Sequence, residues 1–255
     1  MILDSVSTRY GVVCRVAAIG ACVVISATGC NKRKEADSVA AEPQIPTAEA
    51  GPASAEPEMV IDRLVLGGLQ TNCYCLRASK GATQCLIMDT GADGIEPLID
   101  FLKENTLNPA AAVFTHGHHD HINGATLLRK HFPEVRFVIH KDDSKALRDL
   151  AGDLKAAPIE RDGPIELAGI KLEVLHTPGH TPGGICLYSK SQGVVFTGDT
   201  LFAGAIGRTD SRGSTDQLMQ GIKDKLLVLP GEVVVFPGHG PSTTIARERR
   251  LNQFM

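Results

Sequence analysis

Four histidines and one aspartate lie within seven residues of this chain and are its strongest chemical signal. The run Thr115–His121 reads Thr-His-Gly-His-His-Asp-His. Because side chains two apart in an extended segment share a face, His116 and His118 are expected to point together. Asp120 and His121 come from the turn that follows and can reach a second point nearby. Imidazole and carboxylate are metal ligands, so this spacing favours two adjacent metal ions over one.

Three more ligand-type side chains each follow an apolar, β-branched run that breaks into glycine or proline. They are His180, Asp199 and His239, which follow the runs 170–175, 194–196 and 233–236. This pattern is typical of a strand that ends in a loop. Loops at the ends of several strands can converge on one edge of a sheet. The sequence therefore predicts that these side chains join the first cluster in one site.

The elements that must position these residues alternate along the chain. Alternating apolar residues predict strands at 60–66, 73–78, 84–89, 111–115, 135–139, 170–175, 184–189, 194–198 and 232–236. Helical spacing predicts helices near 95–106, 122–131, 141–150, 214–228 and 243–251. Early hairpins followed by alternating strands and helices favour an α/β class, with sheets enclosed by helices.

Composition fits a globular domain and narrows the range of partners. The 255 residues are 43% hydrophobic and 22% charged, which is ordinary for a soluble fold. Residues 59–255 are numerous enough for one domain with a sizeable core. The net charge is −3 and there is no long basic run beyond the N-terminus, so no nucleic acid partner is expected.

The order of the ligands resembles that of the metallo-β-lactamase superfamily, and within it the short, single-domain branch of glyoxalase II-like (hydroxyacylglutathione hydrolase-like) enzymes. The resemblance covers about residues 59–255. Besides the ligands, the segments that resemble this branch are Gly67–Tyr74 (a first hairpin), Ile87–Asp93 (a DxGAD turn), Gly207–Asp210 and Arg247–Phe254. The resemblance implies a four-layer αβ/βα sandwich, which is classed as α/β, or as α+β by some schemes.

The resemblance also assigns roles to the seven ligands. It implies that His116, His118 and His180 bind a first metal and that Asp120, His121 and His239 bind a second, with Asp199 bridging both. The expected cofactors are two divalent ions per chain, zinc in the first place, with iron or manganese as alternatives.

The activity implied is hydrolysis of a small-molecule thioester or ester, such as S-D-lactoylglutathione, by attack of a metal-bridging hydroxide. Asp120 and Asp199 are the residues expected to take part in catalysis. Zinc β-lactamases tend to carry a cysteine at the bridging position, so Asp199 disfavours β-lactam hydrolysis. Full-length glyoxalase II enzymes also have a C-terminal helical domain that helps to bind glutathione, whereas this chain ends at Met255, shortly after His239.

Several alternatives remain open at this stage. Asp89 either supports the ligands through hydrogen bonds or simply forms a turn after a strand. Arg208 and Asp210 either contact substrate or form an ion pair that holds a loop. A mononuclear-iron persulfide dioxygenase shares this fold and a similar Gly-Arg-Thr-Asp stretch, and a broad esterase or lactonase is a further reading. A non-catalytic metal-binding lipoprotein fits less well, because these ligands are spread over the fold.

The N-terminus has the features of a secretory signal. Arg9 and Arg15 precede a short apolar run, Val16–Ile25, and the segment ends in small residues before Cys30. This ending resembles a bacterial lipobox, although Ala27 stands where leucine is usual. We therefore expect a signal peptide over residues 1–30 and lipidation of Cys30.

Residues 31–58 are rich in Ala, Glu, Pro and Ser and are expected to form a flexible tether. The expected protein is thus a bacterial, extracytoplasmic lipoprotein that contacts the membrane only through its lipid anchor. The alternatives are an uncleaved anchor or a misassigned start codon before a cytoplasmic enzyme. Cys75 and Cys85 could face each other in a hairpin as a disulfide, but small buried thiols are favoured.

Overall fold

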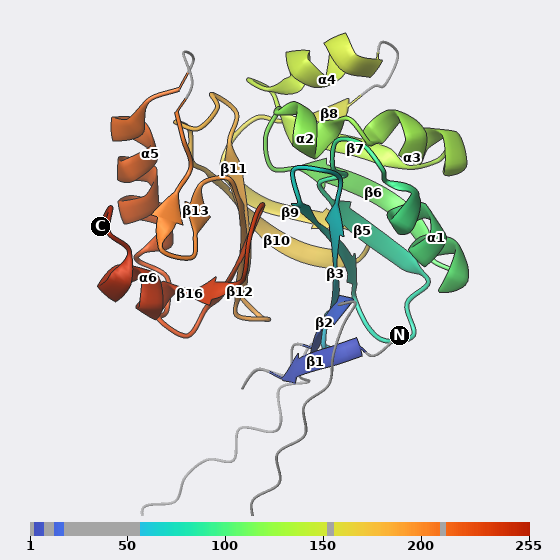
Figure 1. Ribbon diagram of the computed structural model, residues 1–255, viewed down its shortest axis with the longest axis horizontal. Coiled ribbons are helices and arrows are strands. Elements are labelled where there is room, and N and C mark those ends of the chain that lie inside the picture. The colour runs from blue at the N-terminus through green and yellow to red at the C-terminus, as the bar shows by residue number, and fades with distance from the viewer. Residues whose placement is uncertain (1–2, 8–12, 18–56, 152–155, 210–212) are drawn as a thin grey trace, which may run out of the picture.

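Two large sheets packed face to face form the centre of the protein (Figure 1). The computed structural model describes residues 3–7, 13–17, 57–151, 156–209 and 213–255. The first sheet holds eight strands in chain order, and they are β1 (Leu3–Ser7), β2 (Val13–Ala17), β3 (Val60–Leu66), β4 (Thr71–Arg77), β5 (Gln84–Met88), β6 (Asn108–Phe114), β7 (Arg136–His140) and β8 (Ala156–Ile159). Neighbours from β5 to β8 run parallel, so the carboxyl ends of these strands meet at one edge.

The second sheet holds six strands in the order β16-β15-β12-β11-β10-β9. Its members are β9 (Gly163–Leu167), β10 (Ile170–His176), β11 (Ile185–Ser189), β12 (Val194–Gly198), β15 (Val234–Pro237) and β16 (Thr243–Thr244). A small hairpin of β13 (Leu201–Phe202) and β14 (Ala205–Ile206) follows β12. The parallel pair β12 and β15 brings the segments after both strands to the same edge.

Six α-helices cover the outer faces of the two sheets (Figure 1). They are α1 (Glu96–Glu104), α2 (His119–Ile122), α3 (Ala125–His131), α4 (Ser144–Ala151), α5 (Thr215–Gly221) and α6 (Ile245–Leu251), and a π-helical turn, η1 (Ile222–Leu226), continues α5. The helices α1 to α4 lie on the first sheet, and α5, η1 and α6 lie on the second.

Alternation along the strands builds a separate core on each face. On β4, Tyr74 and Leu76 point into the core between the sheets, whereas Cys73 and Cys75 point into the core beneath the helices of the first sheet. A third core joins β11, β12 and β15 to the helices of the second sheet. Since side chains alternate with period two, each sheet can bury both faces only when it is covered on both sides. The expected four-layer αβ/βα sandwich is therefore confirmed.

The predicted elements are all present, with shifted ends. The helix predicted near 122–131 is two helices, α2 and α3, which are separated at Asn123 and Gly124. Five strands of the domain were not predicted, and they are β8, β9, β13, β14 and β16. The last three have only two residues each, whereas β8 and β9 each contain a proline (Pro158 and Pro164) and lie at the edge of their sheets. Proline weakens a strand pattern and is tolerated mainly at such edges.

The N-terminal predictions are largely outside the described residues. Cys30 and residues 31–56 of the expected tether lie there, so lipidation and tethering stay predictions. Within the segment expected to be a signal peptide, β1 and β2 are two unpredicted strands, and β2 pairs in parallel with β3. None of the helices in the described ranges has the length and apolar character needed to cross a membrane.

The domain cysteines are free thiols. Cys73, Cys75, Cys85 and Cys186 are all buried, as the favoured interpretation predicted. A hydrogen bond between the Cys75 and Cys85 side chains, together with burial, raises the pKa of the Cys75 thiol.

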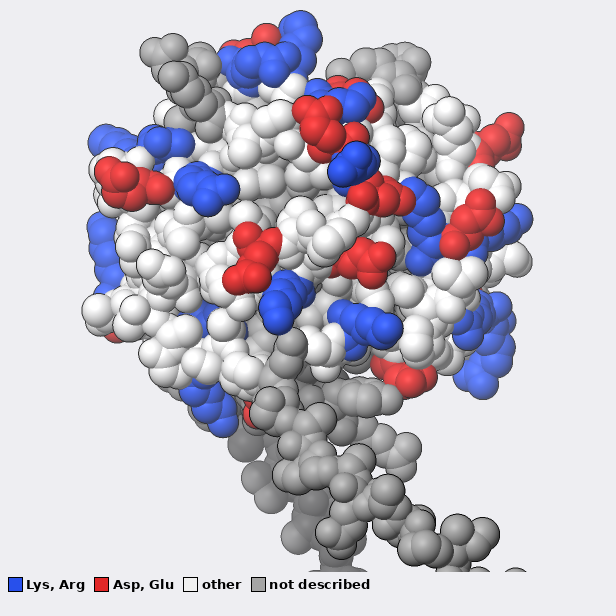
Figure 2. Space-filling view, turned by 180° about the vertical axis from the view of Figure 1, so that it is seen from behind, with Lys and Arg blue, Asp and Glu red and all other residues white. Residues whose placement is uncertain are grey.

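Charged side chains of both signs are interspersed on the surface. Figure 2 shows lysines and arginines beside aspartates and glutamates across one whole face of the described chain. This mixture gives that face no large field of one sign.

The buried carboxylate of Glu248 on α6 holds the β13–β14 hairpin in place. Glu248 has no exposed surface. It accepts hydrogen bonds from Gly204 N at 2.8 Å, Asn252 Nδ2 at 2.9 Å and Thr243 Oγ1 at 2.5 Å. The carboxylate therefore joins α6 to the β13–β14 hairpin and to β16.

Replacing Glu248 with alanine should lower the free energy of unfolding by about 3 kcal/mol, because several buried donors lose their acceptor. Urea denaturation followed by circular dichroism would measure this change. Arg250→Ala on the exposed face of the same helix is the control and should change stability by less than about 0.5 kcal/mol. Equal midpoints for the two variants would contradict the structural role of Glu248.

Candidate metal centre

All seven residues predicted as metal ligands lie together at the edge where the carboxyl ends of the strands meet. His116 and His118 follow β6, Asp120 and His121 belong to α2, His180 lies between β10 and β11, Asp199 follows β12, and His239 follows β15. The two sheets contribute to the same site because their strand ends face each other across the sandwich (Figure 1). The ligand-type side chains that were predicted to follow strand ends therefore do come together at one site.

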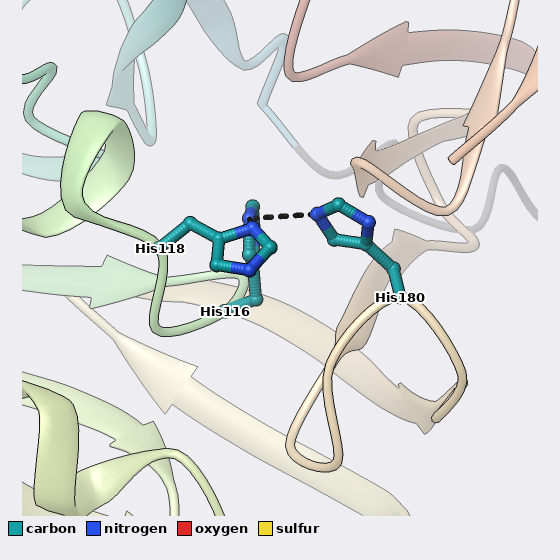
Figure 3. Close-up of side chains that lie close together, drawn as sticks. All are labelled: His116, His118 and His180. Carbon is teal, nitrogen blue, oxygen red and sulfur yellow. Dashed lines mark hydrogen bonds between the residues drawn. The ribbon is translucent and has the colours of Figure 1, made fainter. Parts of the chain in front are cut away.

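The first group contains His116, His118 and His180 (Figure 3). His116 Nε2 lies 3.2 Å from His118 Nδ1 and 3.3 Å from His180 Nε2. A tetrahedral zinc ion with Zn–N bonds of about 2.0–2.1 Å separates its ligand atoms by roughly 3.3–3.4 Å. The three rings also meet edge to face, at interplanar angles of 72–89°. These nitrogens are therefore spaced for one ion.

The second group contains Asp120, His121 and His239. Asp120 Oδ2 lies 3.1 Å from His239 Nε2 and 3.5 Å from His121 Nε2, and the two imidazole nitrogens are 3.3 Å apart. The spacing matches that of the first group. A site with one carboxylate and two imidazoles suits zinc, iron or manganese.

Asp199 stands between the two groups. Its Oδ2 is 3.6 Å from His180 Nε2 in the first group and 3.6 Å from His239 Nε2 in the second. Its Oδ1 is buried and has no hydrogen-bond partner in the described chain, although His121 Nε2 lies 3.4 Å away. A buried carboxylate oxygen without a partner is costly in free energy. A cation held between the groups would satisfy it, so the residues present fit a metal pair.

In the first group, hydrogen bonds on the outer side of the rings fix which nitrogen faces the centre. The His180 Nδ1–H donates to the carbonyl oxygen of Arg208. Thr115 Oγ1 donates its hydrogen to Asp89 at 2.8 Å and so accepts from His116 Nδ1, 3.1 Å away. Both Nε2 atoms are thereby left with a lone pair directed inward. Metal-binding histidines in proteins almost always have such support.

The second group is supported in the same way. The His121 Nδ1–H donates to Asp89 Oδ2 at 2.8 Å, and the His239 Nδ1–H donates to the carbonyl oxygen of Leu69 at 3.1 Å. Asp89 therefore hydrogen-bonds directly to one of the candidate ligands, which favours the first of the two interpretations of this residue left open by the sequence. It is buried and adopts a left-handed backbone conformation, with φ of 55°.

The carboxylates and imidazoles of the centre shift one another's pKa values. Burial and the neighbouring imidazoles hold the pKa of His116 well below its usual range, so this ring is neutral. Burial acts to lower the pKa of His121, but the carboxylates of Asp89 and Asp199 outweigh it and raise the value. Burial acts to raise the pKa of Asp199 and of Asp120, but the adjacent imidazoles hold both carboxyls below their usual values. The ionised carboxylates at this edge supply the negative charge that a divalent cation needs, and neutral imidazoles would be its other ligands.

Glycines beside the ligands permit the close approach of the loops. A Cβ on Gly238 would lie 2.3 Å from Asp199 Oδ1 and 2.8 Å from His121 Cε1. Gly198 has φ of +48°, and a Cβ there would lie 2.5 Å from Thr115 Oγ1. The pairing of β12 with β15 also shifts in register between Phe196 and Gly198, just before Asp199. The sequence showed these glycines only as strand ends.

Of three other predicted or excluded residues, two lie in the described part of the chain. Arg208 supports His180 through its backbone, while its side chain is exposed. Asp210 lies outside the described residues, so the ion pair with Arg208 stays untested. His119 was excluded from the ligands, and its side chain is 68% exposed.

A further group, His140, Asp142 and His176, also brings ligand-type atoms together. Here the imidazole rings are stacked, with centroids 4.1 Å apart and an interplanar angle of 15°. Ring lone pairs lie in the ring plane, so in stacked rings they run side by side and do not converge on one point. This geometry differs from that of the two groups above.

The chain matches the family model of the metallo-beta-lactamase superfamily over residues 66–239. Among curated relatives, it is 35% identical over 211 residues to the hydroxyacylglutathione hydrolase GloC of Haemophilus influenzae, covering 77% of this chain and 98% of that protein. It is 36% identical over 207 residues to the Probable metallo-hydrolase YqgX of Bacillus subtilis, covering 76% of this chain and 96% of that protein.

Solved structures agree with these relatives. A structure of BLEG-1, named a B3 metallo-beta-lactamase, has a TM-score of 0.68 at 33% identity and covers 76% of this chain and 98% of its own. TTHA1623 in a di-iron-bound form has a TM-score of 0.67 at 33% identity, with coverage of 76% and 99%. ETHE1 from Myxococcus xanthus has a TM-score of 0.66 at 26% identity, with coverage of 76% and 83%. Matched along most of its domain in sequence and in fold, this chain belongs to the metallo-beta-lactamase superfamily.

Proposed function

We propose that the protein is a dinuclear metal-dependent hydrolase that cleaves a thioester, such as S-D-lactoylglutathione, to a hydroxy acid and a free thiol. The observation that carries the proposal is the orientation of four imidazoles. His116, His121, His180 and His239 each have one ring nitrogen fixed by an acceptor and the other directed at a common centre. Asp199 lies between the two groups of ligands.

The relatives support this class of reaction. The protein named hydroxyacylglutathione hydrolase is matched over 98% of its length, so a domain of this size can carry that name without a further helical domain. The structure in a di-iron-bound form supports two ions of this kind in the fold. Zinc is the first expectation for the metal, with iron and manganese as alternatives.

Bound divalent ions would supply a hydroxide at neutral pH and positive charge opposite the carbonyl oxygen of a substrate. The residues of the chain would orient the groups that take part in this reaction. Asp120 Oδ2 accepts a hydrogen bond from Thr71 Oγ1 at 3.4 Å, which orients the carboxylate. Its low pKa keeps it ionised and able to accept a hydrogen bond from the attacking water. Asp199 joins the two halves, so its loss should disrupt both.

A mononuclear-iron persulfide dioxygenase is the second candidate, because such enzymes share this fold and a stretch similar to Gly207–Asp210. Metal content and oxygen dependence distinguish the two candidates. The purified protein would be analysed for metals per chain and assayed for thiol release from S-D-lactoylglutathione, with and without O₂. We expect two metals per chain and thiol release that does not depend on O₂.

Other results would redirect the assignment. One iron per chain with O₂ uptake on glutathione persulfide would overturn the hydrolase in favour of the dioxygenase. Two metals per chain without thiol release would overturn the thioester and favour an esterase or lactonase, to be tested with simple esters and lactones. A chromogenic cephalosporin belongs in the same panel because of the likeness to BLEG-1, and we expect Asp199 to make its turnover slow.

Asp199→Asn should lower both metal content and turnover. The amide keeps the size of the side chain but removes the negative charge that both groups of ligands face, so we expect a loss of about 100-fold in turnover. Metal analysis and thiol release would be measured on the same sample. Asp100→Asn, at an exposed position on α1, is the matched control. Full metal content with full turnover in Asp199→Asn would refute the proposed role.

Gly238→Ala should affect the centre without unfolding the domain. Its Cβ would press on Asp199 Oδ1 and His121 Cε1, so the second group must shift. We expect turnover to fall by about 10-fold or more, with a native circular dichroism spectrum. Gly81→Ala, where a Cβ meets no atom within 4 Å, should retain turnover. Unchanged turnover in Gly238→Ala would show that the centre tolerates this displacement.

A further inference from the structure

A buried aspartate outside the predicted site contacts two of the ligand loops. Asp143 directly precedes α4 and is 5% exposed. Its Oδ2 accepts hydrogen bonds from Gly117 N at 2.8 Å and from Thr181 Oγ1 at 2.6 Å. Its Oδ1 accepts one from Gly183 N at 3.0 Å. The carboxylate therefore has three donors from two loops that are distant in sequence.

The donors stand next to the ligands of the first group. Gly117 lies between His116 and His118, and Thr181 directly follows His180. Hydrogen bonds to a carboxylate are about twice as strong as those between neutral groups. Asp143 thus joins the loop of the first sheet to the loop of the second sheet behind the three imidazoles.

Close packing makes this contact rigid. A Cβ on Gly183 would lie 2.7 Å from the backbone nitrogen of Asp143, and a Cβ on Gly117 would lie 3.1 Å from Asp143 Cβ. The backbones of both loops therefore pack directly against Asp143. A small change in the Asp143 side chain should be transmitted to the imidazoles instead of being absorbed by intervening atoms.

The His239 loop of the second group is held by a different contact. Asn72 N donates to the carbonyl oxygen of Gly238 at 2.7 Å, and Asn72 Nδ2 donates to that of Pro237 at 2.8 Å. Thr71 also forms an isolated antiparallel bridge with His239. The loop of His239 is thus fixed to β4, with no contribution from Asp143. The loop of His180 in the first group and the loop of His239 in the second are therefore joined to the first sheet by separate contacts.

We propose that Asp143 is a positioning residue that sets the metal affinity of the first group and leaves that of the second unchanged. The inference rests on the proposed function only in so far as the centre binds metal, and it does not depend on the substrate.

The test uses Asp143→Asn. The amide is close in shape to the carboxylate, but its single oxygen can accept from only one of the two backbone N–H groups, Gly117 or Gly183. The other N–H group then faces the NH₂ of the amide, which is a donor. One ligand loop must therefore move, while the hydrophobic packing of the residue is retained. Asp149→Asn, on α4 with its side chain 60% exposed, is the matched control.

Cobalt binding to the full-length, metal-free protein separates the two groups. His239→Ala would leave the first group as the tighter site, and His118→Ala would leave the second. Asp143→Asn is introduced into each background, and the Co²⁺ dissociation constant is measured from the visible absorption of the bound ion. We expect a loss of affinity of about 10-fold or more in the His239→Ala background and a change below about threefold in the His118→Ala background.

Each other outcome is decisive. An equal loss of Co²⁺ affinity in both backgrounds would show that Asp143 acts on the fold as a whole, and no loss in either would show that it does not position the ligands. A wild-type protein that binds no Co²⁺ would overturn this inference and the dinuclear centre together. A protein that binds two Co²⁺ with the expected selectivity but releases no thiol would overturn the proposed function alone.

Discussion

The hydrogen bonds of the buried Asp89 carboxylate are the interaction on which the centre depends. Asp89 accepts from Thr115 N at 2.9 Å, from Thr115 Oγ1 at 2.8 Å and from His121 Nδ1 at 2.8 Å. It therefore fixes His121 in the second group directly and His116 in the first through Thr115. A non-glycine residue in the left-handed region is strained, and such strain persists only where surrounding contacts impose it. Here the three hydrogen bonds impose it.

An aromatic cluster beneath the ligands holds the two sheets in register. Tyr74 on β4 packs edge-on against Phe196 and Phe236, with ring centroids 5.3 and 5.6 Å apart. Its hydroxyl donates to the carbonyl oxygen of Pro237 at 2.7 Å. Phe196 comes three residues before Asp199, and Phe236 three residues before His239. Packing in the core between the sheets thus determines where two ligands emerge at the edge.

The sequence predicted which ligand-type side chains come together, because their positions follow from local patterns. An apolar run that breaks into glycine or proline identifies the end of a strand, and the ends of several strands can converge on one edge of a sheet, so His180 and Asp199 could be placed near the first cluster without coordinates. The supporting acceptors could not be predicted in this way. The carbonyl oxygens of Leu69 and Arg208 belong to the backbone and have no side-chain signature, and their roles depend on how distant loops meet. For Asp89 the sequence left two roles open, because aspartate is common both in turns and as a hydrogen-bond acceptor for metal-binding histidines.

The separate contacts of Asp143 and Asn72 suggest how the metal affinity of each half of the centre can change on its own. The first group is joined across the sheets by a carboxylate, whereas the second is joined by the amide and backbone of Asn72. Because the two contacts share no residue, we expect a change in one to alter the affinity of one proposed metal site with little effect on the other. Asp199 is the point where the halves meet, and its buried Oδ1 lacks a hydrogen-bond partner among the described residues. Metal binding should therefore stabilise the folded protein, since the same cation that completes the centre also satisfies this oxygen.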